Sequence, residues 1–197
     1  YRIIMMSDLH MDGVTSNRWL QKIVQRVNTL KPDLVVIPGD LIDHNRQELL
    51  QYATTLRQLS ARDGVYVTTG NHEFYAGVQN FLKFVGDANL TLLGNRHVVL
   101  PNGLQIAGVH DQQGGRIAGF ATDHHAALAG IDRTQTTVLL CHEPLDFAKA
   151  VDLGVDLQLS GLCDHPWRQV DTDQSPGNRL EREPAQPRST SQIEHIE

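Results

Sequence analysis

The sequence predicts an α/β layered fold, and three observations support this prediction. Apolar runs of strand length alternate with segments whose apolar residues recur at helical spacing, up to about Gly161. The longest apolar runs, such as residues 34–37 and 137–141, are too short to span a bilayer. A chain of 197 residues can bury one hydrophobic core but not two full ones. We therefore expect one compact α/β domain.

Strands are predicted where short apolar runs stop at Gly, Pro, Asp or Asn. They cover residues 2–6, 33–37, 65–69, 91–93, 97–100, 104–109, 136–140 and 156–159. Helices are predicted where apolar residues recur every three or four positions. They cover residues 16–30, 46–61, 77–87, 122–130 and 145–152. Strand–helix alternation favours parallel strands, whereas the turn at residues 101–103 favours an antiparallel pair, so mixed sheets are expected.

The composition of the chain changes near Gly161. Apolar residues become sparse after this point, and four of the eight prolines lie beyond residue 165. Such a segment has no apolar periodicity with which to bury a face. We therefore predict an incomplete domain at residues 1–165 and a polar, Pro-rich, poorly ordered tail at residues 166–197.

The charge balance and the histidine content narrow the function. The chain carries 17 basic and 23 acidic residues, a net charge of −6, which disfavours broad nucleic-acid binding. It also contains ten histidines. We assign His44, His97 and His195 to the surface, and we expect metal binding from others because imidazole is a common metal ligand. The two cysteines, Cys141 and Cys163, do not indicate a disulfide framework.

Polar motifs follow five of the predicted strands directly. They are Ser7-Asp8-Leu9-His10, Gly39-Asp40-Leu41-Ile42-Asp43, Gly70-Asn71-His72-Glu73, Cys141-His142-Glu143-Pro144 and Ser160-Gly161-Leu162-Cys163-Asp164-His165. Each motif alone is explained by turn or capping chemistry, and a lone His142 by a structural hydrogen bond. Five such motifs at the same edge favour a shared site instead, because ligands bind at the carboxyl ends of the strands in open α/β sheets.

Four of these motifs together resemble the calcineurin-like metallophosphoesterase superfamily: Asp8-x-His10, Gly39-Asp40-x-x-Asp43, Gly70-Asn71-His72-Glu73 and His142. The stretches SDLHMDG, PDLVVIPGDLID, GVYVTTGNHEFYAG and AGVHD are most similar to its bacterial branch of small phosphodiesterases. The resemblance covers residues 1–161. It implies a four-layer α/β/β/α sandwich of two mixed sheets, here truncated at its C-terminal end, with two divalent metal ions at one rim. It also implies phosphoester hydrolysis by a hydroxide formed from water between the ions.

The resemblance assigns metal ligands to individual residues. Asp8 and His10 would bind the first ion, and the carboxylate of Asp40 would bridge both ions. Asn71 and His142 would bind the second ion. Imidazole together with oxygen ligands suits Mn²⁺, Fe or Zn²⁺ better than Ca²⁺, and the sequence leaves the choice among them open.

The resemblance assigns three further residues to roles without metal contact. His72 would contact the phosphate and help to protonate the leaving group, which makes it the expected catalytic residue. Asp43 and Glu73 would orient the ligands and the backbone. An alternative for these two is that they are solvent-exposed capping carboxylates, and the residues alone explain either role equally well.

The last motif of the superfamily, Gly-His-x-His, is missing. Leu162 stands in the place of its first histidine and cannot bind a metal ion. Asp164 stands in the place of the second, and His165 lies one place later, so either could serve as a ligand. Cys163 could bind metal as a thiolate, although a small buried thiol is the better explanation.

The superfamily motif Gly-His-x-His and the apolar pattern of strands and helices are both absent from the sequence just after Gly161. We therefore hypothesise that a frameshift or a fusion has replaced the native sequence after Gly161. The strands missing as a result would leave a sheet edge exposed. Translation of the coding DNA in the other two frames tests this hypothesis. It fails if neither frame contains Gly-His-x-His followed by apolar strands.

Two functions of different classes follow from these observations. The first is a metal-dependent hydrolase of phosphodiesters or small phosphomonoesters. The second is a catalytically impaired relic of the same fold that binds a metal ion or a partner without turnover, which Leu162 favours. A DNA nuclease is disfavoured by the net charge, and a protein Ser/Thr phosphatase by the small size. Residues 110–125 form a predicted loop near the rim that could shape the substrate pocket, although an ordinary surface loop is the better explanation for most of it.

The sequence leaves the localisation open between the cytoplasm and a membrane-associated or exported state. The chain begins on a predicted strand at Tyr1, without an initiator Met. Membrane association, which the resemblance to the bacterial branch implies, would therefore depend on an anchor that precedes Tyr1.

Overall fold

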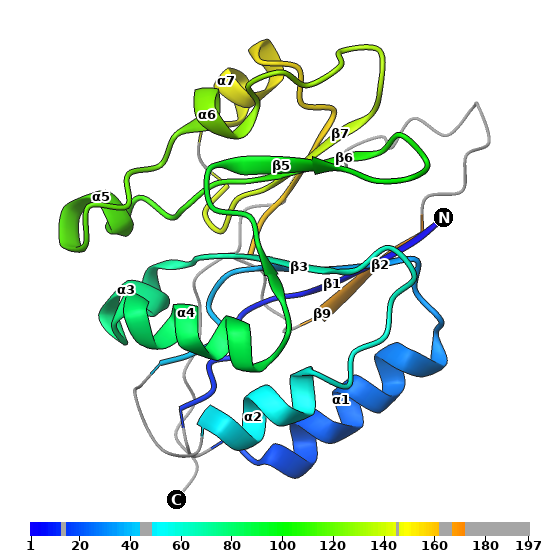
Figure 1. The fold of residues 1–197 in the computed structure, drawn as a ribbon, viewed down its shortest axis with the longest axis vertical. Coiled ribbons are helices and arrows are strands. Elements are labelled where there is room, and N and C mark those ends of the chain that lie inside the picture. The colour runs from blue at the N-terminus through cyan, green and yellow to red at the C-terminus, as the bar shows by residue number, and fades with distance from the viewer. Residues whose placement is uncertain (13–14, 44–48, 145, 162–166, 172–197) are drawn as a thin grey trace, which may run out of the picture.

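The computed structural model describes residues 1–12, 15–43, 49–144, 146–161 and 167–171, the last range by its backbone. Two β-sheets are stacked face to face, and helices cover the outer face of each (Figure 1). This α/β/β/α arrangement confirms the predicted fold class. No helix in the described ranges is both long and apolar enough to cross a membrane.

The first sheet has the strand order β4-β3-β2-β1-β9. Its strands are β1 (Arg2–Met6), β2 (Leu34–Pro38), β3 (Val65–Thr68), β4 (Thr91–Leu92) and β9 (Trp167–Asp171). The first four are parallel, and β9 runs antiparallel to β1. Its outer face is covered by α1 (Asn17–Thr29), α2 (Leu49–Leu56) and α4 (Val78–Asp87) (Figure 1).

The second sheet has the strand order β5-β6-β7-β8. Its strands are β5 (Arg96–Val99), β6 (Gln105–Gly108), β7 (Thr137–Leu140) and β8 (Leu157–Leu159). The pair β5–β6 is antiparallel and the other pairs are parallel. Both sheets are therefore mixed, as predicted. The outer face carries α6 (His124–Ala127) and α7 (Phe147–Asp152) (Figure 1).

Three apolar clusters fill the three spaces between the four layers. Strand β2 shows why its sequence is apolar throughout: Val35 and Ile37 pack with residues of the helices, whereas Leu34 and Val36 pack between the sheets. Strands buried on both faces have no need of polar alternation. A third cluster joins the second sheet to α6 and α7. The packed layers hold the strand ends, and therefore the polar motifs that follow them, at defined positions.

Three elements differ from the sequence prediction. Strand β9 lies inside the predicted tail, where Val170 pairs with Ile3, so the predicted boundary at residue 165 precedes the last strand of the sheet. The hydrogen bonds between neighbouring strands use backbone groups that nearly every residue has, so the pattern of side chains did not reveal strand β9. Two short helices, α3 (Asn71–Tyr75) and α5 (Gln113–Ile117), were also not predicted. Both lie at the same end of the sheets (Figure 1).

Several predictions concern residues outside the described ranges. These include residues 172–197 of the predicted tail, and the candidate residues His44, Leu162, Cys163, Asp164, His165 and His195. The predicted helix 46–61 corresponds to α2, and its first three residues also lie outside these ranges.

Candidate metal centre

The loops that follow β1 and β2 run side by side and bring their carboxylates together. The backbone N–H of Asp8 donates to the carbonyl of Gly39 at 3.4 Å, and that of His10 donates to the carbonyl of Asp40 at 3.0 Å. An isolated parallel bridge between Met11 and Ile42 extends this pairing past the strand ends. Segments about 30 residues apart in sequence are thus joined at the sheet edge.

Three candidate ligands of these loops adopt left-handed backbone conformations. The φ angles are +55° for Asp8, +42° for His10 and +53° for Asp40. This region costs about 1–2 kcal/mol for a residue with a Cβ, although Asp tolerates it better than most. Unfavourable conformations of this kind cluster at functional sites, where surrounding contacts hold them in place.

His142 lies against Asp40 at the end of β7. Its Nε2 is 3.1 Å from Asp40 Oδ2, and its Nδ1–H donates to the carbonyl of Pro38 at 2.9 Å. Burial alone would lower the pKa of His142, but the hydrogen bond and the charge of Asp40 raise it to about 9. Both ring nitrogens therefore carry protons near pH 7 when no metal is bound, and the Nε2 proton occupies the direction in which a cation would bind.

The same partners act on the Asp40 carboxylate. Burial favours its neutral form, but the hydrogen bond and the charge of His142 and the backbone N–H of His72 lower the pKa of Asp40 below its ordinary value. The N–H of His72 donates to Asp40 Oδ1 at 3.1 Å. Asp40 is only 3% exposed, and both of its oxygens face polar groups of the site.

Asp8 provides a test of whether these residues fit a metal ion. Its Oδ2 is buried and has no hydrogen-bond partner within the described part of the chain, and burial raises the pKa of the carboxyl. Ligand atoms of Asp8, Asp40 and His142 all lie within 4.8 Å of one another. A buried, unpartnered carboxylate oxygen beside a second carboxylate and an imidazole fits a divalent cation.

Asp43 joins His10 to His72. Its Oδ1 accepts a hydrogen bond from Nδ1–H of each ring, at 2.8 Å in both cases, and the two rings meet edge to face. These bonds leave His10 Nε2 directed toward the carboxylates of Asp8 and Asp40, at 3.9 and 3.8 Å. Burial lowers the pKa of His10, but the hydrogen bond and the charge of Asp43 raise it overall. A carboxylate behind a histidine is the usual way in which a metal-binding imidazole is oriented.

Glu73 supports the loop that carries Asp40 and is not an exposed cap. It is fully buried, and its carboxylate accepts hydrogen bonds from the backbone N–H groups of Gly70, Asp40, Leu41 and Ile42. Burial and the nearby charge of Asp40 raise its pKa to about 7. Glu73 therefore ties the start of α3 to the loop after β2.

Two glycines permit close approaches around the site. A Cβ at Gly70 would lie 2.1 Å from Asp40 Oδ1, and a Cβ at Gly161 would lie 2.4 Å from His142 Nδ1. Both distances are far below contact distance, so any side chain would displace the ligands. Gly161 also donates its N–H to the carbonyl of His142 at 2.8 Å, which brings the end of β8 against the site.

The structure brings most of the predicted site residues together. Asp8, His10, Asp40, Asp43, His72, Glu73 and His142 are linked by the contacts described above. Asn71 is the first residue of α3, between Gly70 and His72, whose backbones both approach Asp40. Asp164 and His165 lie outside the described residues, so their contribution as ligands stays a prediction.

Sequence reasoning missed Asp111, which belongs to this neighbourhood. It follows β6 and is 4% exposed; burial raises the pKa of its carboxyl, the charge of His142 opposes this rise and the charge of Asp40 adds to it. Its backbone N–H donates to Thr69 Oγ1 at 3.0 Å, and the same hydroxyl contacts His110 Nδ1 at 3.2 Å. The strand-end rule that identified the other residues applies equally to this position. Most of residues 110–125 are exposed or half-buried, as a surface loop would be, whereas His110, Asp111 and His124 are buried.

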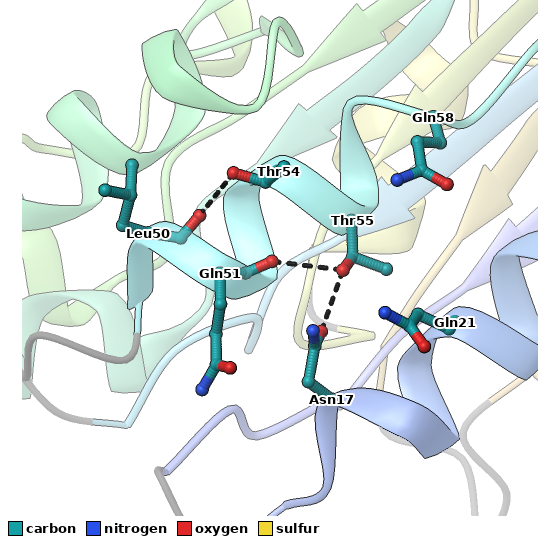
Figure 2. Close-up of a pocket in the computed structure, with 7 residues that line it drawn as sticks. All are labelled: Asn17, Gln21, Leu50, Gln51, Thr54, Thr55 and Gln58. Atoms are coloured by element: carbon teal, nitrogen blue, oxygen red, sulfur yellow. Dashed lines mark hydrogen bonds between the residues drawn. The ribbon is translucent and has the colours of Figure 1, made fainter.

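A separate groove lies between α1 and α2 in the outer helical layer (Figure 2). It has a volume of about 650 Å³ and is lined mainly by amide and hydroxyl side chains, including Asn17, Gln51 and Thr55. Thr55 donates a hydrogen bond to the side chain of Asn17 at 2.8 Å (Figure 2). None of its described lining residues is a carboxylate, imidazole or thiol, so it supplies no metal ligands.

The raised pKa of His142 predicts how the stability of the metal-free protein depends on pH. The folded state holds this proton more tightly than the unfolded state, so the stabilisation is complete below pH 6.5 and is lost as pH rises toward about 9. We expect the loss to be on the order of 2–3 kcal/mol. Urea unfolding in the presence of a chelator, from pH 6 to 9.5, measures it. His142→Gln should flatten this part of the curve, and an equally steep curve for that variant would contradict the assignment.

Asp43→Asn is expected to lower both metal affinity and any phosphoester hydrolysis by about 10–100-fold, the range for residues that orient metal ligands. Two imidazole N–H groups would then share a neutral amide oxygen in place of a carboxylate. Metal titration and steady-state rates, compared with Asp87→Asn on the exposed side of α4, measure the effect. Unchanged metal affinity would show that Asp43 does not orient a ligand.

Comparisons with known proteins agree with this geometry. The sequence model of the family described as calcineurin-like phosphoesterase matches residues 1–170. An uncharacterized metallophosphoesterase of Helicobacter pylori is 33% identical over 161 residues, which cover 81% of this chain and 43% of the relative. A Bos taurus transmembrane protein with metallophosphoesterase domain is 32% identical over 170 residues, which cover 80% of this chain and 38% of the relative. The chain thus spans less than half the length of these relatives.

A solved structure is similar in fold. NAD nucleotidase of Haemophilus influenzae superposes with a TM-score of 0.54 at 15% identity, covering 81% of this chain and 38% of that protein. At this identity the likeness concerns the fold alone. The family model, in contrast, covers most of the chain, including all the strand-end residues described above. The chain belongs to the calcineurin-like phosphoesterase family.

Proposed function

We propose that this protein hydrolyses phosphoesters with two divalent metal ions bound at the edge of its sheets. The observation that carries this proposal is the position of Asp40, whose buried carboxylate faces His142 directly and lies next to Asp8 and His10. Of the groups present, only a carboxylate can bridge two cations and offset part of their mutual repulsion. The substrate in this proposal is a phosphodiester or a small phosphomonoester.

The metal ions would supply Lewis-acid activation of the phosphoryl group and would lower the pKa of water. Asp8 and His10 would hold one ion and Asn71 with His142 the other, with Asp40 shared between them. The hydrogen bond from His142 to Pro38 and that from His10 to Asp43 set the directions of the two Nε2 atoms. Glu73 holds the Asp40 loop by its backbone.

His72 is the group best placed to transfer a proton. Its side chain is 37% exposed, and its Nδ1–H is held by Asp43, so Nε2 is the nitrogen left for the substrate. With Nδ1–H anchored, Nε2 is the atom through which the ring would pass a proton to the leaving oxygen. General acid catalysis of this kind contributes about 10²–10⁴-fold.

Hydrolysis of bis(4-nitrophenyl) phosphate by the full chain tests the proposal. We expect activity that requires added Mn²⁺, Fe²⁺ or Zn²⁺, is removed by a chelator and returns when metal is restored. Metal content measured by elemental analysis should approach two ions per chain. Tight binding of one ion without hydrolysis would favour the catalytically impaired relic instead, and neither binding nor hydrolysis would refute both.

Membrane attachment through a segment that precedes Tyr1 is a separate proposal. It is supported by the Bos taurus relative, whose name describes a transmembrane protein. Translation of the coding DNA upstream of Tyr1 tests it. An upstream reading frame without an apolar segment of about 20 residues would argue against this form of attachment.

A further inference from the structure

A small cavity lies beside the candidate metal centre, among the ends of β6 and β7 and the start of α6. Six of its lining residues are ionisable: His110, Asp111, His124, Cys141, Glu143 and Asp146. Its volume of about 10 Å³ has room for one water-sized group. Cys141 and Glu143, the residues on either side of His142, both line it, so the cavity adjoins the candidate metal centre at which a phosphoryl group would bind.

The lining of this cavity is electronegative. Three carboxylates line it, and none of the described lining residues is Lys or Arg. Burial is the main cause that lowers the pKa of His110 and of His124, with Arg96 adding to it for the first and Lys149 for the second, so neither ring offsets the negative charge. A cation in the cavity would therefore be stabilised by charge.

His124 supplies a second, independent indication of an occupant. It is 2% exposed, and its Nε2 has no hydrogen-bond partner among the residues that the structure describes. A buried ring nitrogen without a hydrogen-bond partner is unfavourable unless a bound group forms that hydrogen bond. As a neutral ring, His124 can present a lone pair at Nε2 and accept a hydrogen bond from that group.

The size and the donor pattern favour a primary ammonium over a metal ion. In the described part of the chain, two groups of His, Cys, Asp and Glu side chains come close enough to share a metal ion, and neither includes a residue of this cavity. A primary ammonium is about as large as water and, unlike a metal ion, can be held by as few as two close acceptors, such as one carboxylate oxygen and one imidazole lone pair. The hydrogen bonds it would form are charge-assisted and therefore strong.

We propose that this cavity binds a primary ammonium group of the substrate, so that the preferred phosphoester carries an aminoalcohol. This inference rests on the proposed hydrolase function, because it assigns the substrate class of the same site. Asp111 would be the main partner of the ammonium, since it is the buried carboxylate of the three that line the cavity.

Two esters that differ only in the ammonium test the proposal: 4-nitrophenyl 2-aminoethyl phosphate and 4-nitrophenyl ethyl phosphate. We expect kcat/KM to be about 10- to 100-fold higher for the aminoethyl ester. Asp111→Asn and Glu143→Gln should each reduce this ratio toward one. Asp87→Asn removes an equal charge far from the lining and should leave the ratio as in the unaltered chain. A ratio near one in the unaltered chain, or one that both cavity variants retain, overturns the proposal.

A binding measurement separates this inference from the proposed hydrolysis. Calorimetric titration of the full chain with Mn²⁺ present compares phosphoethanolamine with ethyl phosphate, and it needs no turnover. Tighter binding of phosphoethanolamine that Asp111→Asn abolishes supports the ammonium site even if neither ester is hydrolysed. Equal binding of both ligands means that the cavity holds only a buried water, and the proposal is then wrong even if both esters are hydrolysed.

Discussion

Asp40→Asn is expected to reduce metal-dependent phosphoester hydrolysis by more than about 100-fold, beyond the 10–100-fold range of residues that merely orient ligands. The substitution preserves size and an acceptor for the N–H of His72. It removes the negative charge that faces His142 at 3.1 Å and that would offset the repulsion between two cations. Both metal positions would be weakened at once, because both share this carboxylate.

The experiment compares rates and bound metal for the unaltered chain, Asp40→Asn and the surface control Asp87→Asn. Without Asp40 the pKa of His142 should also fall toward its ordinary value, because Asp40 is the main group that raises it. Titration of His142 by NMR in the metal-free protein follows this change. Activity of Asp40→Asn within a few-fold of the unaltered chain would remove the basis of the two-metal proposal.

Glu73→Ala is expected to destabilise the domain by about 3–5 kcal/mol, because it leaves buried donors unsatisfied. Four backbone N–H groups bind this carboxylate, at 2.6–3.2 Å. Glu73→Gln keeps one acceptor oxygen but places an amide N–H₂ against backbone donors, so an intermediate loss of about 1–3 kcal/mol is expected.

Urea unfolding at pH 8 measures these changes, with Gln79→Ala on the exposed surface of α4 as a control that should stay within about 0.5 kcal/mol. The pKa of Glu73, raised to about 7, adds a pH signature. The folded state holds this proton more tightly, so stability declines as pH rises from 4.5 to 7, and Glu73→Gln should remove that decline. A loss below about 0.5 kcal/mol for Glu73→Ala would show that Glu73 does not hold the Asp40 loop.

The strand-end motifs allowed most of the candidate site to be predicted. Asp8, Asp40 and His142 each follow a short apolar strand, and the rule that ligands gather at the carboxyl edge placed them together. The same rule covers Asp111, which was missed because most of the loop that contains it, residues 110–125, was assigned to the surface. The ring of His110 packs against Phe74 of α3 and against Phe120 of its own loop, and no local pattern reveals the contact with Phe74.

Strand β9 was missed for a different reason, because its composition resembles that of the tail around it. Residues 167–171 have a tail-like composition, yet they pair with β1 along its whole length. Pairing at the edge of a sheet needs free backbone donors and acceptors and little from the side chains. Composition predicts whether a segment can build its own core, and it does not predict whether an existing sheet will accept the segment as an edge strand.

The sequence by itself determined the layered α/β fold, the family and the residue types at the sheet edge, because strand length, helical spacing and strand-end motifs are local properties. Only the tertiary structure decided what each residue contacts. It showed that Glu73 is a buried support, that Asp43 serves two histidines, and that Asp111 and His124 line a cavity beside the ligands. The reason is physical: distances between loops far apart in sequence are set by how the layers pack.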